Sequence, residues 1–313
     1  MQSSFNKLIV VLSFIVLTAC SSHSSQNDQD NSSAMRSGSL FFPLPVPLKA
    51  SYQDEVNLLR INQLIADKSN VDNKQRAILL YERGLIYDRM GLSAHSRFDF
   101  SQAIQLDPTF AEAYNSLGLY LLMGEAYDEA FEAFDSAIEL SDDVQFSYLH
   151  RAVGLSLVGR YDAAKEDIER FYALDKTDPY RVLWRYLIDY KVDPQLATEQ
   201  LKSAQAPADN SNFAWGIVDV MNGKISEQAF FENISNGITT NEELAQRLCE
   251  AYYYLAHWHI NHNNINQGIY YLKLSLAANV QDFIEYKYAL LDLKAIQTQL
   301  QHAELKKAEA KIN

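Results

Sequence analysis

The sequence predicts an all-α protein built as a solenoid of helical hairpins. The main observation is a period of 34 between residues 77 and 178, in which Gly84 recurs as Gly118 and Phe100 as Phe134. A copy of this length holds two short helices and a turn, and neither helix could bury its apolar face alone, so the copies must stack. The composition agrees with this class, because Gly and Pro are scarce (11 and 7 of 313 residues) and no strand-like alternation meets an Asn-Gly or Asp-Gly turn.

Further positions of the repeat follow the tetratricopeptide (TPR) pattern. Small residues recur where the two helices of one hairpin should cross, and a large apolar residue recurs where it would fill the gap between hairpins. This spacing resembles the TPR repeat, so we expect three TPR repeats in residues 77–178. The recurring residues are Ser96, Ala130 and Ala164; Ala103 and Ala137; and Phe100, Phe134 and Ile168.

The first twenty residues resemble a bacterial lipoprotein signal. Lys7 precedes an apolar run from Leu8 to Leu17, which is far shorter than the roughly 20 residues that span a bilayer. The run ends in Leu17-Thr18-Ala19-Cys20, which resembles the lipobox at which a peptidase cuts before a lipid-modified cysteine. We therefore expect residues 1–19 to be a signal peptide and Cys20 to carry lipid. An ordinary signal peptide with a chance cysteine is the alternative.

Residues 20–50 should connect this lipid to the folded body. Ser21 follows the cysteine in place of aspartate, and by resemblance to enterobacterial sorting rules this implies the periplasmic face of the outer membrane. Residues 21–39 are almost entirely polar, which predicts a disordered tether. Extended at roughly 3.3 Å per residue, residues 21–50 would reach about 100 Å. The stretch 40–48 alternates Pro with apolar residues, and it either packs against the body or recruits a partner.

The remaining domain boundaries follow from helix-start signals and changes in periodicity. An amphipathic helix in residues 51–76 should precede the repeats, and helical hairpins with a degenerate pattern should follow them in 179–248. A TPR-like hairpin and a final helix of about 282–297 should occupy 249–297, and the tail 298–313 should extend that helix or fray. The predicted helix starts are the capping box Asp72 to Gln75, the pairs Asp107-Pro108, Asp178-Pro179 and Asp193-Pro194, then Ser226, and Thr240 with Glu243.

The net charge of −13 excludes two classes of partner. No basic stripe is present to neutralise nucleic-acid phosphates, and an acidic chain is not attracted to an anionic bilayer surface. Any membrane attachment must therefore be covalent or hydrophobic. Because Cys249 is then the one remaining cysteine, no intramolecular disulfide is available, and its apolar helical surroundings predict a buried, inert thiol.

The inner helices of TPR repeats line a concave groove, and the residues at the groove positions are largely apolar here. A charged clamp for a peptide carboxylate is not expected, because only Asn115 and Arg89 resemble it and its lysine is missing. The groove should be filled by the chain's own helices, by a second copy, or by a hydrophobic segment of a partner. The candidate protein-binding residues are Tyr81, Leu85, Arg89, Asn115, Leu119, Met123, Leu149 and Val153, and Asp88 occupies a further groove position.

Enzyme chemistry finds little support in the sequence. No Gly-x-Ser-x-Gly, phosphate loop or Cys-His signature is present. His257, His259 and His262 suggest a metal site at first, but on a helix only His259 and His262 share a face, and no third ligand is evident. We expect no catalytic residue, no metal and no cofactor.

The chain resembles the NlpI-type TPR lipoproteins of Gram-negative bacteria. The segments that carry the resemblance are YERGLIYDRMGL, FDFSQAI, AYDEAFEAFDSAIEL and YLKLSLAANVQDFIEYKYALLDL, together with the LTAC lipobox. The resemblance implies a homodimeric outer-membrane adaptor without catalytic residues. Such an adaptor recruits a periplasmic tail-specific protease to peptidoglycan endopeptidases and organises cell-wall hydrolases. A structural role in outer-membrane β-barrel assembly is the alternative. The long tether and the tail after residue 298 depart from the family.

Overall fold

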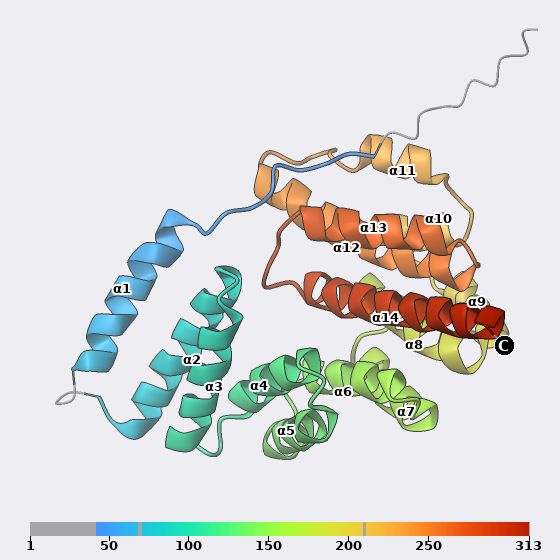
Figure 1. The fold of residues 1–313 in the computed structure, drawn as a ribbon. Coiled ribbons are helices and arrows are strands. Elements are labelled where there is room, and N and C mark those ends of the chain that lie inside the picture. Colours follow the sequence, from blue (N-terminus) through green and yellow to red (C-terminus); the bar gives the residue numbers. More distant parts are fainter. Residues whose placement is uncertain (1–41, 68–70, 209–210, 313) are drawn as a thin grey trace, which may run out of the picture. The chain divides into compact units, whose positions relative to one another are not determined.

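The computed structural model describes residues 42–67, 71–208 and 211–312. Every regular element in these ranges is an α-helix, which confirms the predicted all-α class (Figure 1). Cys20 and the predicted signal and tether up to residue 41 lie outside the described residues. The helices are α1 (Tyr52–Ala66), α2 (Asn73–Arg89), α3 (Ser93–Leu106), α4 (Ala111–Met123), α5 (Tyr127–Leu140), α6 (Phe146–Leu157), α7 (Tyr161–Leu174), α8 (Pro179–Val192), α9 (Pro194–Ser203), α10 (Ala214–Met221), α11 (Glu227–Asn233), α12 (Asn241–Asn261), α13 (Ile265–Ala277) and α14 (Ile284–Ile312).

The three predicted repeats are the consecutive hairpins α2–α3, α4–α5 and α6–α7, and each packs on the next (Figure 1). The recurring glycine has a steric cause. A methyl group on Gly84 would lie 2.6 Å from the Phe100 ring, and one on Gly118 would lie equally close to Phe134. The two helices of a hairpin therefore cross too closely for any side chain at this position. This close crossing lets the phenylalanine ring fill the space between the helices.

A buried ion pair also links the two helices of the first and third repeats. Arg83 of α2 binds Asp99 of α3 with two hydrogen bonds of 2.6 and 2.7 Å. Arg151 of α6 makes the same pair of contacts with Asp167 of α7, both at 2.7 Å. Both aspartates are almost fully buried. This two-fold contact orients one helix against the other, because the planar guanidinium matches the carboxylate geometry.

Most of the predicted helix starts are confirmed. Asp72 and Gln75 form a reciprocal capping box at the start of α2. The carboxylates of Asp178 and Asp193 accept backbone hydrogen bonds at the starts of α8 and α9, each with Pro as the next residue. Ser226 caps α11 and Thr240 caps α12 in the same manner. These side chains satisfy backbone N–H groups that have no partner within the helix.

The prediction for Asp107-Pro108 is wrong. Asp107 is the C-cap residue of α3, and α4 begins only at Ala111. The Asp107 carboxylate instead accepts hydrogen bonds from the backbone N–H and the hydroxyl of Thr109. This local turn lowers the pKa of Asp107, chiefly through the Thr109 hydroxyl. The turn competes with helix capping because an aspartate can bond a backbone group two residues ahead.

The proline-rich segment 42–48 packs against the chain's own C-terminal hairpin. Phe42 makes edge contacts with the rings of Tyr270 and Tyr271. Tyr252 donates a hydrogen bond of 2.7 Å to the carbonyl of Pro43, and the Leu48 amide donates to the carbonyl of Ala278. Of the two alternatives for this segment, the structure shows packing in cis.

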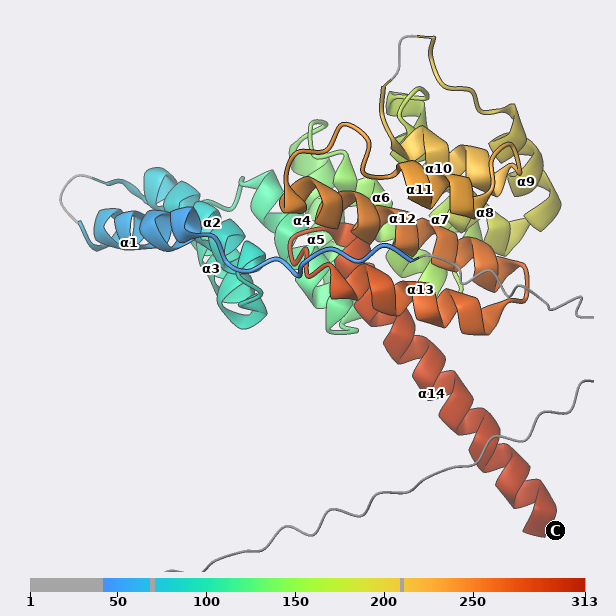
Figure 2. The ribbon, with the colours of Figure 1, turned by 90° about the horizontal axis from the view of Figure 1, so that it is seen from above.

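The last helix extends the body beyond its expected end. We expected a final helix of about 282–297, and α14 continues to Ile312. Figure 2 shows the C-terminal part of α14 projecting past its neighbours, and the side chains of 297–306 are exposed. The tail therefore extends the helix. None of the described helices has both the length and the apolar content that a membrane crossing requires.

Candidate functional site

The predicted groove residues of the first repeat are engaged within the chain. Tyr81 is half-buried, with its ring 5.5 Å from that of Phe100 and 4.9 Å from that of Phe110. Leu85 is half-buried as well. Arg89 donates a hydrogen bond of 2.7 Å from Nη2 to the carboxylate of Asp54 in α1. The Arg89 guanidinium thus joins α1 to the first repeat.

Most of the predicted groove residues in the second and third repeats lie in the interior. Leu119, Leu149 and Val153 are buried, Leu149 completely. The Asn115 side-chain oxygen accepts a hydrogen bond of 2.9 Å from the Ser147 hydroxyl. The three buried side chains are therefore not accessible to a partner in this structure, which corrects their selection as candidate binding residues. Met123 alone of these five predicted residues lines an open hollow.

Helix α14 packs against the third repeat and the helix that follows it. Its residue Tyr288 is 1% exposed and packs against the ring of Trp184, with the ring centroids 5.5 Å apart. The Tyr288 hydroxyl and His150 Nδ1 of α6 share a hydrogen bond of 2.7 Å. Burial, aided by the charge of Lys287, lowers the pKa of His150 to about 3, so the imidazole is neutral. The chain's own last helix thus packs against the inner helix of the third repeat at His150.

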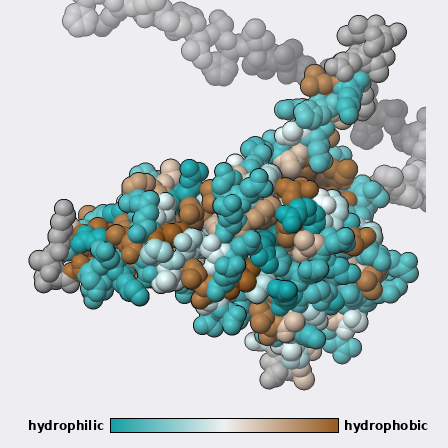
Figure 3. All heavy atoms as spheres, turned by 90° about the horizontal axis from the view of Figure 1, so that it is seen from below, coloured by the Kyte–Doolittle hydropathy of each residue, from teal (hydrophilic) through white to brown (hydrophobic). Residues whose placement is uncertain are grey.

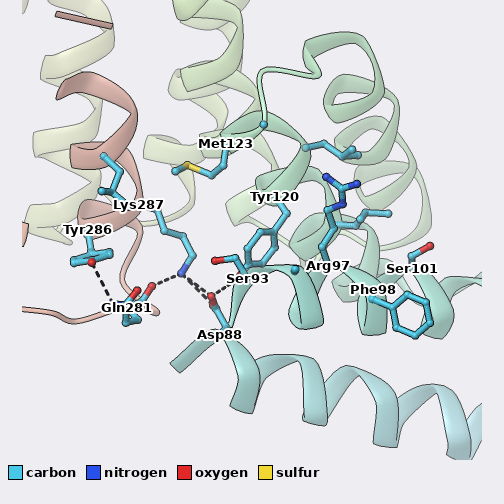
Figure 4. Close-up of a pocket in the computed structure, with 15 residues that line it drawn as sticks. Asp88, Ser93, Arg97, Phe98, Ser101, Tyr120, Met123, Gln281, Tyr286 and Lys287 are labelled. Atoms are coloured by element: carbon cyan, nitrogen blue, oxygen red, sulfur yellow. Dashed lines mark hydrogen bonds and ion pairs between the residues drawn. The ribbon is translucent and has the colours of Figure 1, made fainter. Parts of the chain in front are cut away.

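A cleft remains open where α14 begins. It has a volume of about 780 Å³ and lies between α3, the C-terminal half of α4 and the first turns of α14 (Figure 4). The lining residues are Asp88, Ser93, Ala94, Arg97, Phe98, Ser101, Leu117, Tyr120, Leu121, Met123, Gly124, Gln281, Tyr286, Lys287 and Leu290. This volume lies within the range of about 300–1,000 Å³ that is typical of ligand pockets.

One side of the cleft is held by a buried polar network, visible in Figure 4 as dashed lines. Lys287 Nζ of α14 lies 3.0 Å from Asp88 Oδ1 of α2 and donates a hydrogen bond of 2.6 Å to the carbonyl of Gln281. The Tyr120 hydroxyl donates to the same Asp88 carboxylate. Burial and this carboxylate raise the pKa of Tyr120. The network joins α14 to α2 and α4 of the first two repeats. In it, the charge of Asp88 is neutralised by Lys287.

The opposite side of the cleft is apolar and exposed. Phe98 of α3 has 62% of its surface exposed, and Leu290 of α14 has 44%. Leu117, Leu121 and Met123 of α4 also line the cleft and are half-buried. Figure 3 shows the molecule from below, where apolar residues form separate patches among polar ones. A concave site with both apolar walls and charges is a better candidate for binding than such scattered patches.

Sequence reasoning found Asp88 and Met123 of this cleft and missed its α3 and α14 residues. A signal for one of them was present in the sequence. Ser96, Phe100 and Ala103 mark the inward face of α3, so Phe98 two residues earlier must point outward. A large aromatic residue at an outward position indicates a contact with something other than the repeat. The residues of α14 carry no such signal, because the repeat pattern does not include that helix.

Two other predictions concern the histidines and the second cysteine. His257 Nε2 lies 2.9 Å from Asp292, and His259 Nε2 lies 2.9 Å from Glu227, so each ring faces a carboxylate of a different helix. Within the described residues, no three His, Cys, Asp or Glu side chains form a group that could hold a metal. Cys249 is fully buried with its pKa raised by burial, which confirms the buried thiol.

Comparisons with known proteins give one family match, in the first repeat, and several solved structures of low similarity. A family model described as tetratricopeptide repeat matches residues 77–110. The solved structure of MamA is 23% identical, with 47% of this chain and 84% of that chain covered and a TM-score of 0.40. YrrB, described as a TPR protein with an unusual peptide-binding site, is 13% identical over 74% and 98% of the two chains, with a TM-score of 0.39. Yeast Tom70 is 18% identical over 82% and 62%, with a TM-score of 0.39.

The family match falls on the first of the three hairpins that share the 34-residue period. Together with the helical hairpins of the structure, it supports the tetratricopeptide class for these repeats. Stacked hairpins of this class form extended surfaces for binding other proteins. The resemblance to NlpI-type lipoproteins stays a prediction.

Proposed function

We propose that this protein is a lipid-anchored TPR adaptor that binds other proteins and catalyses no reaction itself. The observation that carries the proposal is the open cleft between α3, α4 and the start of α14. The exposed side chains of Phe98 and Leu290 would leave water when a partner binds, and their burial would stabilise the complex.

The anchor is part of the same proposal and rests on the sequence. Lipid on Cys20 would hold the protein at the periplasmic face of the outer membrane, and more than one acyl chain makes such anchoring stable. Because residues 42–48 are hydrogen-bonded to the body, only residues 21–41 would count toward its reach. Extended, they span about 70 Å, which is less than the value for residues 21–50. Radiolabelled palmitate incorporated by the chain and lost in Cys20→Ala would support the anchor, and label retained in the variant would contradict it.

The partners that we propose come from the resemblance to NlpI-type lipoproteins. They are a periplasmic tail-specific protease and the peptidoglycan endopeptidases that it degrades. An adaptor that holds both raises the effective concentration of one for the other without any chemistry of its own. The purified chain should degrade nothing alone and should accelerate degradation of an endopeptidase when the protease is added.

This assay also separates the alternatives. An unchanged rate of degradation across a range of adaptor concentrations would contradict the proposal. Affinity capture from envelope extracts should yield the protease and hydrolases. Capture of β-barrel assembly proteins in their place would favour the structural role, and release of muropeptides by the purified chain would indicate an enzyme.

We also propose that the protein is a homodimer. The first helix has α2 as its main neighbour, and it leaves Tyr52 79% and Leu59 66% exposed. Ile78 of α2 is 51% exposed. Exposure of several large apolar side chains at one end of a solenoid is unfavourable in water unless another surface covers them. Sedimentation equilibrium at micromolar concentration should give the mass of two chains, and a mass of one chain would contradict the dimer.

A further inference from the structure

We propose that the cleft binds a segment of a partner protein in which large apolar side chains stand next to an aspartate or glutamate. This inference rests on the proposed adaptor function and specifies the chemistry of the partner. The carboxylate would pair with Arg97, and the apolar side chains would pack against Phe98 and Leu290.

The charge of the cleft favours an acidic partner. Its charged lining residues are Asp88, Arg97 and Lys287, which leaves one net positive charge in a chain whose total is −13. Asp88 and Lys287 already neutralise each other at 3.0 Å, and Tyr120 donates to the same carboxylate. The positive charge of the cleft therefore belongs to Arg97.

Arg97 has no partner of its own in the described part of the chain, where no hydrogen bond or ion pair involves its side chain. The nearby carboxylates have other partners. Asp99 is buried and bound by two nitrogens of Arg83, and Glu125, which follows the lining residue Gly124, pairs with Lys294. An exposed guanidinium with five N–H donors is well suited to a carboxylate from another molecule, which it can hold with two hydrogen bonds.

The apolar wall specifies the rest of the partner segment. Phe98 follows Arg97 directly in α3, so a side chain that packs on the phenyl ring places its neighbour near the guanidinium. Leu290 of α14 and Met123 of α4 line the same cleft (Figure 4). A cleft of about 780 Å³ is large enough for several side chains of a peptide segment.

Selection from a random peptide library tests the inference without a known partner. The bait is the full chain purified in detergent, and the peptides are displayed as internal loops so that the only carboxylates are side chains. A parallel library with free C-termini separates side-chain carboxylates from a terminal one. The matched baits are Arg97→Gln, which removes the charge of the cleft, and Arg60→Gln, which removes a similarly exposed charge from α1.

The wild-type chain and Arg60→Gln should both enrich loops with an Asp or Glu beside Leu, Ile, Phe or Trp. Arg97→Gln should lose the acidic preference, and a selected loop should bind it about tenfold more weakly. Phe98→Ser should weaken the same loop while leaving the preference for acidic residues intact.

Several outcomes would overturn the inference. They are enrichment of basic or uncharged loops, an acidic preference that survives Arg97→Gln, enrichment only in the library with free C-termini, and no enrichment at all. Conversion of a dimer to a monomer by Arg97→Gln would also overturn it, because the cleft would then hold a second copy. Accelerated proteolysis in the adaptor assay combined with any of these results would refute the partner chemistry and leave the adaptor function standing.

Discussion

In the third repeat the inner helix α6 contacts α14 through His150 and Tyr288, whereas in the first repeat α2 meets only the start of α14. His150 and Leu149 of α6 are both buried, and His150 shares a hydrogen bond with Tyr288 of α14. In the first repeat, α14 reaches α2 through the single ion pair of Lys287 with Asp88, and the cleft begins there. The repeat pattern thus determines how each hairpin is built, and the helix outside the pattern decides which part of the surface stays open.

We call α6, α8, α12 and the part of α14 that packs on them the covered end. It differs in a second respect, because it contains two carboxyl groups, Glu250 and Glu285, with little compensating charge. Tyr254 donates a hydrogen bond of 2.7 Å to Glu285 at the start of α14, and Tyr180 donates one of 2.9 Å to Glu250 of α12. Burial, followed by repulsion from Glu285, raises the pKa of Glu250 to about 8. Burial also raises the pKa of Glu285. The open cleft holds no comparable pair of acids among its lining residues.

The largest effect is expected at the covered end, from Trp184→Ala. Trp184 is 2% exposed and packs against Tyr253, Tyr254 and Tyr288, so its removal leaves a cavity between α8, α12 and α14. We expect a loss of about 3–5 kcal/mol in the free energy of unfolding, measured with urea. Tyr161→Ala on the outer helix α7, 41% exposed in the native chain, is the control and should cost far less. Equal losses would contradict the covered core.

The next effect is a dependence of stability on pH that comes from Glu250 and Glu285. Their pKa values in the folded protein lie above those of the unfolded chain, so the folded state binds more protons. Their stabilising contribution is complete below the unfolded pKa and is lost as the pH rises through about 8. Each unit of pKa difference is worth about 1.4 kcal/mol, so urea unfolding should show lower stability at about pH 9 than at about pH 6.

Replacing one acid of the pair isolates this contribution. Glu250→Gln should flatten the profile, because the amide can still accept from Tyr180 and carries no charge at any pH. Glu242→Gln, an exposed acid in the first turn of α12, should leave the profile unchanged. A steep profile that survives Glu250→Gln would show that other groups cause it. Arg247 and Lys287 are the cations whose charges oppose the shifts.

A smaller effect tests whether the first and third repeats are equally stable apart from their contacts with α14. Asp99→Asn and Asp167→Asn each weaken the same two-fold contact with an arginine, and each arginine keeps a second partner, Asn62 or Asp135. We expect each to cost about 1.5–3 kcal/mol, with the two losses within about 0.5 kcal/mol of each other. A much larger loss at Asp167 would indicate that α14 and its neighbours rely on the third hairpin being intact.

The smallest effect is expected at the cleft. Arg97 is exposed and has no partner in the described ranges, so Arg97→Gln should change the free energy of unfolding by less than about 0.5 kcal/mol. Lys287→Gln at the same cleft is the comparison. Because Lys287 is buried, this variant should have a clearly lower free energy of unfolding than the wild-type chain. A marked destabilisation by Arg97→Gln would mean that the side chain serves the fold.

The sequence predicts the repeats well because their spacing reflects a steric requirement. Gly84 and Gly118 each face a phenylalanine ring, whereas the third repeat has Ala152 and Ile168 at the corresponding positions. In the second repeat, Leu117 and Ala133 stand where the other two have an Arg–Asp pair. Each hairpin still forms with these different residues, so the 34-residue period can be recognised in the sequence despite them.

The candidate site was much less predictable. Residues that line it come from α3, α4 and α14, and contacts between segments far apart in the chain leave no periodic signal. The buried groove positions Leu149 and Val153 illustrate the point, because their apolar character predicted either a partner or the chain itself as the cover. Only the packing of Tyr288 against Trp184 and His150 decides between them.

Site-specific photo-crosslinking tests the central claim, that the protein binds its partners at the open cleft. A benzophenone amino acid replaces Phe98 in one variant and Tyr161 on the outer helix α7 in another, both of them exposed aromatic positions. Irradiation of cell envelopes should link position 98, and not position 161, to another protein that mass spectrometry identifies. Equal crosslinking from both positions, or none from position 98, would contradict the claim.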